Sequence, residues 1–148
     1  MCMELIKLTW KPLLSVLSNL MKSTSEESNL QMLLNSYQNF IGVCGSVSLK
    51  GTAGNLPYEA RDAFLESLCS FCLTPVAQQD KSATQGTRVT TQNSTYGGDF
   101  TLTDKNLQIC KTLLNIAHCL GYLLDVRSWY LLLDCMQRIE TTISRTAK

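Results

Sequence analysis

Residues 105–133, KNLQICKTLLNIAHCLGYLLDVRSWYLLL, decide the fold of this chain, because apolar side chains recur in them at helical spacing. The first part predicts one helix with two apolar stripes. These are Leu107, Cys110, Leu114 and Ala117 on one side, and Ile109, Leu113, Ile116 and Leu120 on the adjoining side. Since most of its circumference is apolar, we expect other helices to cover it from more than one direction.

The ends of this helix and the start of the next follow from capping residues. Thr103 is a good N-cap, and Leu102 and Leu107 around it predict a hydrophobic staple. Gly121 weakens the C-terminal end, and Ser128 is predicted to cap a fifth helix. We expect Trp129 to be buried between the two helices. The apolar side of the fifth helix comprises Trp129, Leu132, Leu133, Met136, Ile139 and Ile143.

Two helices are predicted upstream by the same spacing. In the first, Pro12 fits the first turn, so Thr9 is the expected cap. Its stripe is Trp10, Leu13, Leu14, Leu17, Leu20 and Met21. In the second, Gly42 and Gly45 predict a frayed end. Its stripe is Leu30, Leu33, Leu34, Tyr37, Ile41 and Cys44.

A third helix is predicted to open at Pro57 and to stop near Leu73, because Pro75 forbids it from running further. Its expected core side is Phe64, Leu65, Leu68, Phe71 and Cys72. Residues 78–99 then contain no Leu, Ile, Phe, Met or Trp, and such a stretch cannot bury enough surface to offset its chain entropy. It is predicted to be a mobile insertion.

These patterns predict one all-α domain of about five helices in layers. Residues 1–77 form a helical hairpin plus the third helix, residues 78–102 a polar flexible insertion, and residues 103–148 a two-helix unit that packs on the first part. The chain has 24 leucines and only 17% charged residues, so its helices cannot cover one another completely. We therefore expect a piece of a longer helical stack, whose flanking helices cover the remaining apolar faces.

Composition excludes several classes of function. The net charge is +1 and no basic cluster occurs, so nucleic acid is not an expected partner. No apolar run approaches the roughly 20 residues that span a bilayer, and Glu4 interrupts the start where a secretory signal is apolar. Seven cysteines, an odd number in apolar stretches, indicate reduced buried thiols. The sequence predicts an intracellular, soluble chain, in which the sequon at Asn93 is there by chance.

Three groups of residues were considered for chemistry, beginning with the cysteines. Cys69 and Cys72 have metal-ligand spacing, but no second pair or histidine spacing completes a zinc site. Structural burial is the better interpretation for both. His118, the single histidine, follows Ala117 in an apolar helix and precedes Cys119, and a capping or packing role is favoured over a nucleophilic pair.

The third group is Glu59, Asp62 and Glu66, which follow helical spacing with Arg61 among them. This arrangement is typical of a solvated helix face. No Gly-rich phosphate loop or nucleophile elbow occurs. No catalytic, cofactor-binding or metal-binding residue is therefore assigned, no cofactor is expected, and the chain is predicted not to be an enzyme.

Residues 102–139, LTDKNLQICKTLLNIAHCLGYLLDVRSWYLLLDCMQRI, resemble part of the monensin-sensitivity (Mon-two) family, Golgi proteins related to the large Arf guanine-nucleotide exchange factors. The core of the resemblance is TLLNIAHCLG followed by Ser128 and Trp129. LTWKPLLSVLSNLM, FIGVCG and DAFLESLC resemble the same family in the same order. One departure is the turn before the Ser-Trp pair, where Asp125, Val126 and Arg127 replace an expected Gly-containing turn.

The resemblance implies an armadillo- or HEAT-like α-solenoid, peripheral on Golgi and endosomal membranes from the cytoplasmic side, with a scaffold role in vesicle traffic. It implies protein partners: a Dopey-family protein, Arf-like GTPases, or the rest of the same solenoid. It carries over no catalytic residue. The alternatives are a regulatory region of an Arf exchange factor whose Sec-seven catalytic domain lies elsewhere, and, less favoured, a cysteine-dependent enzyme.

Overall fold

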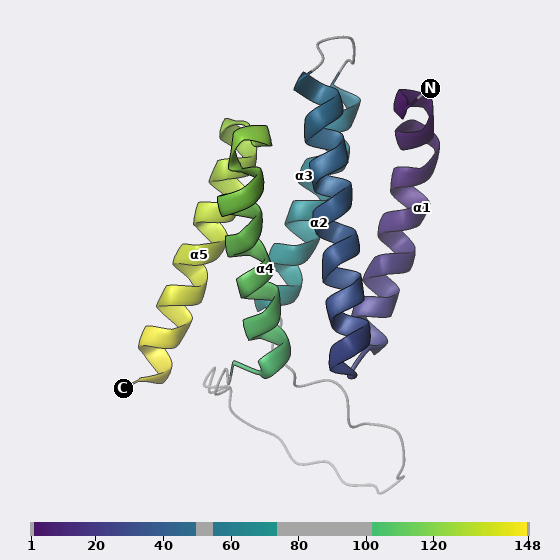
Figure 1. The fold of residues 1–148 in the computed structure, drawn as a ribbon. Coiled ribbons are helices and arrows are strands. Elements are labelled where there is room, and N and C mark those ends of the chain that lie inside the picture. Colours follow the sequence, from purple (N-terminus) through teal and green to yellow (C-terminus); the bar gives the residue numbers. More distant parts are fainter. Residues whose placement is uncertain (1, 50–54, 74–101, 148) are drawn as a thin grey trace, which may run out of the picture.

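The computed structural model describes residues 2–49, 55–73 and 102–147, and every regular element in them is helical. The all-α prediction with five helices is confirmed (Figure 1). The elements in chain order are α1 (Cys2–Ser23), α2 (Glu27–Leu49), α3 (Leu56–Leu73), α4 (Asp104–Leu120), a short 3-10 turn η1 (Gly121–Leu123) and α5 (Val126–Thr146).

Helix α3 is the centre of the packing, because it contacts α1, α2, α4 and α5. Helices α1 and α5 lie at opposite edges of the molecule, with α2 and α3 between them (Figure 1). Helix α4 contacts both α2 and α3, whereas α5 packs mainly on α3. The layered arrangement thus depends on α3 being apolar on several sides.

One continuous core joins all five helices. Its aromatic centre is Phe64 of α3, which meets Tyr37 edge-on at 5.5 Å between ring centroids and stacks on Phe40 at 4.2 Å. The predicted stripe of α2 is buried in full, as are Ile109, Leu113 and Ile116 of α4. The other predicted stripe of α4 is less covered, since Leu107 and Leu114 are exposed. Phe71 of α3 is only half-buried.

The predicted start of the first helix was wrong. Helix α1 begins at Cys2, so Thr9 is not its cap and Pro12 lies in its interior. Ile6 is buried and extends the apolar stripe of Trp10 upstream, which favours helix before the proline. Pro12 and Leu8 are both exposed, so the Leu8 carbonyl that loses its donor faces water.

The predicted fraying of α2 at its glycines was also wrong, since the helix continues to Leu49. Gly45 is buried, and a Cβ atom placed on it would lie 2.6 Å from Cβ of Leu123. Glycine is needed here because η1 passes directly against the backbone of α2. Tertiary packing therefore sustains the helix through a residue that locally ends helices.

The structure confirms Thr103 as the cap of α4. Its hydroxyl accepts the Asn106 backbone N–H, and the Asn106 side chain accepts the Thr103 backbone N–H in return at 3.1 Å. This reciprocal pair is a capping box in which asparagine replaces the usual Glu or Gln. The Asn106 amide also donates to the carbonyl of Cys72 at 3.0 Å, so the cap joins α4 to the end of α3.

Two predictions at the start of α5 were wrong. Asp125, not Ser128, is the N-cap, because its carboxylate accepts the Ser128 backbone N–H at 2.9 Å. Ser128 itself is fully buried. Trp129 is half-buried rather than buried, and its ring packs at the Gly121 corner between α4 and η1.

The predicted insertion at 78–102 lies almost entirely outside the described residues, as does the sequon at Asn93. The division of the chain at 77 and 103 stays a prediction. Within the described helices, none combines the length and the hydropathy required to cross a membrane.

Candidate functional site

A buried polar network lies where the N-terminal half of α3 meets the corner between η1 and α5. Its centre is Arg61, whose side chain has no exposed surface. The guanidinium Nε and Nη2 donate to Oδ1 of Asp62 at 3.1 and 3.0 Å, and Nη1 donates to the carbonyl of Leu123 at 3.1 Å. Nη2 also lies 2.8 Å from Oδ2 of Asp125. Arg61 therefore joins η1 and the cap of α5 to α3.

Asp62 is the second member of the network, and it is 6% exposed. It accepts the buried hydroxyl of Ser128 at 2.6 Å on the same oxygen that binds Arg61. Its other oxygen lies 3.7 Å from Nε of Arg127, an exposed side chain at the start of α5. Two cations and two carboxylates thus balance, which is what allows ionised groups to be buried.

Asp125 combines the roles of helix cap and ion-pair partner. Burial raises the pKa of its carboxyl, but the Ser128 amide and hydroxyl and the Arg61 guanidinium outweigh burial, so the pKa is lowered overall. In the turn before Ser128, Asp125 supplies the cap and Arg127 the exposed cation of this network.

The network is saturated with hydrogen bonds. Among the described residues, the one buried side-chain oxygen or nitrogen without a partner is Oε1 of Gln108, which lies on α4 and outside this network. The contacts of Arg61 with Leu123 and Asp125, and the hydrogen bond from Ser128 to Asp62, join different elements, so the arrangement fixes helices relative to one another. We interpret it as structural.

The interpretation of Glu59, Asp62 and Glu66 as one solvated face was therefore partly wrong. Glu59 and Glu66 are exposed, but Asp62 and Arg61 are buried. The sequence did contain an indication that Arg61 is buried. Arg61 precedes Phe64 and Leu65 by three and four residues and so lies on the apolar stripe of α3. What the sequence did not show is that Leu123 accepts a hydrogen bond from Arg61 and that Ser128 donates one to Asp62, each over more than 60 residues.

Cys69 and Cys72 are buried as predicted, but the structure brings further cysteines to them. Cys135 of α5 and Cys110 of α4 approach from the facing helices. In the part of the chain that the structure describes, no group of three or more His, Cys, Asp or Glu side chains is arranged to hold a metal ion. Each of the three buried sulfurs instead faces a different backbone carbonyl, as detailed below.

His118 and Cys119 lie on the exposed side of α4, where Nδ1 of the histidine is 3.6 Å from the cysteine sulfur. The same sulfur is 3.3 Å from Oδ1 of Asn115. His118 occupies the last turn of α4, where a cation is favoured by the helix dipole. The exposed position, on the outside of a helix, offers no enclosed space around the two side chains.

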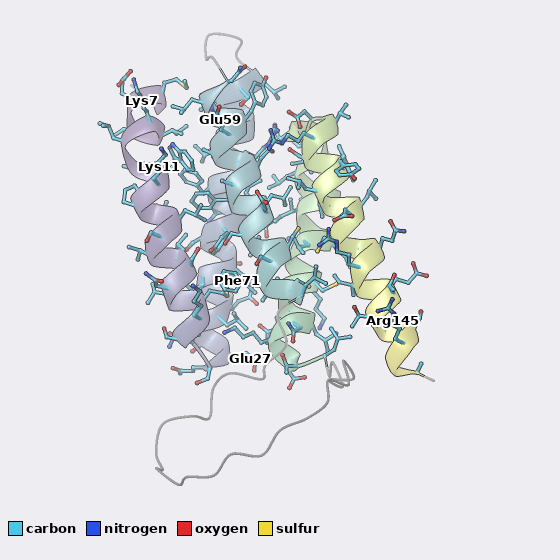
Figure 2. The ribbon with its side chains drawn as sticks, turned by 180° about the vertical axis from the view of Figure 1, so that it is seen from behind. Lys7, Lys11, Glu27, Glu59, Phe71 and Arg145 are labelled. Carbon is cyan, nitrogen blue, oxygen red and sulfur yellow. The ribbon has the colours of Figure 1, made fainter. Side chains whose placement is uncertain are left out.

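Two exposed apolar stripes are the candidate contact surfaces. On α5, Val126, Tyr130 and Leu133 follow helical spacing on one side and are 88%, 70% and 62% exposed. On α1, the stripe comprises Leu5, Leu8, Val16 and Leu20. Lys7 and Lys11 project from α1 and Arg145 from the end of α5, at opposite edges of the molecule (Figure 2). Interaction surfaces are a common reason for several large apolar side chains to stay exposed together.

The fold and the buried network define a layered all-α protein in which an apolar core and one buried polar network hold the helices together, while apolar stripes remain exposed at both edges. The chain is similar to Protein MON2 homolog of Homo sapiens, at 26% identity over an alignment of 167 residues, gaps included, that covers 92% of this chain. It is 28% identical to the Xenopus laevis homologue over 92% of its length and 25% identical to the Drosophila melanogaster homologue over 94%. The resemblance to the monensin-sensitivity family is confirmed.

The chain spans only about a tenth of the length of these relatives, 9% of the human and frog proteins and 10% of the fly protein. No protein-family model matches it, and no solved structure matches it significantly.

Proposed function

We propose that this chain is a non-catalytic scaffold segment of a large protein of Golgi and endosomal membrane traffic, and that it acts in vesicle-mediated transport through protein–protein contacts. The similarity to MON2 homologues over more than nine-tenths of the chain supports this assignment. The saturated network around Arg61 supports a structural rather than a catalytic use of its charged residues. The protein is cytoplasmic, and the full-length chain associates peripherally with the membranes.

The observation that carries the proposal is the apolar stripe of Val126, Tyr130 and Leu133 on α5. In an armadillo- or HEAT-like solenoid, such a stripe packs on the next helical layer or receives a protein partner. A Dopey-family protein and an Arf-like GTPase are the partners that we propose. Both edges of the molecule carry such stripes, as expected of a segment that is extended by further helices.

The test introduces charge into the stripe of the full-length protein. Tyr130→Glu with Leu133→Glu adds two carboxylates at exposed apolar positions, and Gln137→Glu with Thr141→Glu adds the same charge at exposed polar positions of α5. We expect the first pair to abolish co-purification of the partner and Golgi location, and the second pair to preserve both. Unchanged unfolding midpoints of both variant chains exclude misfolding. Equal behaviour of the two pairs would contradict the proposal.

The alternative, a regulatory region of an Arf exchange factor, is distinguished by a second measurement on the full-length protein. A scaffold leaves the release of fluorescent GDP from an Arf GTPase at its spontaneous rate. Accelerated release that requires a domain outside this chain would replace the scaffold proposal with the alternative.

A further inference from the structure

Three thiols meet where α3 packs on α5. Cys69 and Cys72 lie three residues apart on α3 and therefore on one side of the helix, and Cys135 faces them from α5. Their residues are 9%, 0% and 2% exposed, and all three belong to the main core. None of the three is used by the polar network or by the exposed stripes.

Cys69 and Cys135 each donate a hydrogen bond to a backbone carbonyl of the facing helix. The Cys135 thiol donates to the carbonyl of Cys69 with the sulfur 3.9 Å from the oxygen. The Cys69 thiol donates to the carbonyl of Leu131, one turn before Cys135, also at 3.9 Å. Each sulfur thus lies against the backbone of the other helix, which places the two side chains next to each other. Cys72 is directed elsewhere, toward the carbonyl of Asn106 at 3.7 Å.

The neighbouring thiols also determine which sulfur loses its proton first. The neighbouring thiols of Cys69 and Cys72 lower the pKa of Cys135, against the opposing effect of burial. The proximity of Cys135, together with burial, raises the pKa values of Cys69 and Cys72. Cys135 is therefore the sulfur of the cluster for which the thiolate is most favoured, and the thiolate is the form that reacts with oxidants.

We propose that Cys135 and Cys69 form a reversible disulfide when the protein meets hydrogen peroxide, and that this bond closes the α3–α5 contact covalently. Cys72 lies beside this pair, but its thiol is directed toward the carbonyl of Asn106. Because the reaction of bulky disulfide oxidants depends on access to the thiol, a small oxidant such as hydrogen peroxide is the co-reactant that we name.

The chemistry balances in two steps. The Cys135 thiolate attacks one peroxide oxygen, the O–O bond breaks, and hydroxide leaves, so that sulfur is oxidised to sulfenic acid by two electrons. The Cys69 sulfur then attacks the sulfenic sulfur, gives up its proton, and displaces the hydroxyl as water. Two thiols and one hydrogen peroxide yield one disulfide and two waters once the hydroxide is protonated.

The bond would close a loop between residues that are 66 positions apart. Cross-links across long loops stabilise a fold chiefly by restricting the unfolded chain. The oxidised protein is therefore expected to unfold at a higher denaturant concentration than the reduced protein. We also expect the bond to hold α5 against α3. The apolar stripe of α5 is then presented on a more rigid helix.

The experiment treats the whole purified chain with hydrogen peroxide in a Cys119→Ser background, which removes the cysteine that is exposed among the described side chains and so reduces cross-links between molecules. Peptides are then mapped by mass spectrometry without reduction. We expect a peptide pair joined through Cys69 and Cys135, a mass lower by two hydrogens, reversal by dithiothreitol, and a raised unfolding midpoint.

Variants make the assignment specific. Cys69→Ser should block the link and leave a sulfenic acid on Cys135 that dimedone traps, whereas Cys44→Ser, which removes a buried thiol elsewhere in α2, should leave the link intact. Circular dichroism of each variant checks folding. A link through Cys72 in place of Cys69, or a link that forms only in denaturant, would overturn the proposal. So would oxidation that leaves all three core thiols free.

Discussion

Arg61 donates to partners in three parts of the chain while having no exposed surface, so its removal leaves buried acceptors without a donor. Breaking a buried ion pair by removing one partner typically costs about 3–5 kcal/mol, whereas replacing both partners by apolar residues is often close to neutral. Arg61→Met should therefore lower the free energy of unfolding by about 3–5 kcal/mol, and Arg61→Met with Asp62→Leu should recover most of it. Urea unfolding measures both.

The matched control is Arg138→Met, which removes a cation from an exposed pair with Asp134 on α5. Such surface pairs contribute at most about 1 kcal/mol. If Arg61→Met cost no more than Arg138→Met, the central role of Arg61 would be refuted. A double variant as unstable as the single one would show that Leu123 and Asp125, not Asp62, are the acceptors that depend on the guanidinium.

Asp125 makes the stability of the molecule depend on pH. Its pKa is lowered in the folded state from an ordinary value of 3.8, so its stabilising contribution is complete above that value and is lost as pH falls toward the folded pKa. Asp125→Asn should lower the unfolding midpoint at pH 7. The difference between wild type and variant should shrink below about pH 4. A difference that stays constant down to pH 3 would contradict the role of the ionised carboxylate.

At the scale of elements, substitutions of the two glycines of α2 test how closely η1 packs against α2. A Cβ atom on Gly45 would lie 2.6 Å from Cβ of Leu123, while one on Gly42 would lie 3.6 Å from the side chain of Leu120, an ordinary contact. Gly42→Ala should stabilise the protein by about 0.5–1 kcal/mol through helix propensity. Gly45→Ala should instead destabilise it by about 1–3 kcal/mol, because η1 must move away from α2.

Thermal unfolding followed by circular dichroism compares the two alanine variants directly. They share the same helix, the same substitution and the same gain in propensity, so the difference between them isolates the contact with η1. Stabilisation by both substitutions would mean that η1 moves at little cost and that glycine is not required at position 45.

At the scale of the whole molecule, the central position of α3 predicts one cooperative unit. Trp10 lies on α1 at one edge, and Trp129 lies on α5 at the other, so each tryptophan reports on a different edge. Because α3 contacts both α1 and α5, we expect fluorescence and circular dichroism to give the same urea midpoint within each variant protein, Trp10→Phe or Trp129→Phe. The midpoints of the two variants are not compared with each other, since each substitution has its own effect on stability.

Different midpoints for the two probes within one protein would contradict this prediction. They would show instead that residues 1–77 and 103–148 unfold separately. In that case the two-part division of the chain would describe two units and not one domain.

The sequence alone was sufficient for the helices and for several of their ends. Helical spacing predicted all five helices, and Thr103 and Pro57 were correctly placed at helix starts. These features depend on residues within a few positions of one another, so local chemistry determines them. The resemblance to the monensin-sensitivity family was likewise inferred from short stretches such as TLLNIAHCLG.

The tertiary structure alone decided which side chains meet across the helices. Arg61 reaches Leu123 and Asp62 reaches Ser128 over separations of 62 and 66 residues, and Cys69 meets Cys135 over 66. Asp62 was predicted to be a surface carboxylate from its position on the helix, because the sequence does not show that Ser128 donates a hydrogen bond to it. Gly45 looked like a helix end because only the approach of Leu123 explains a glycine there. Local patterns determine where helices form, whereas burial of a charge or a thiol depends on the surface that a distant segment brings to it.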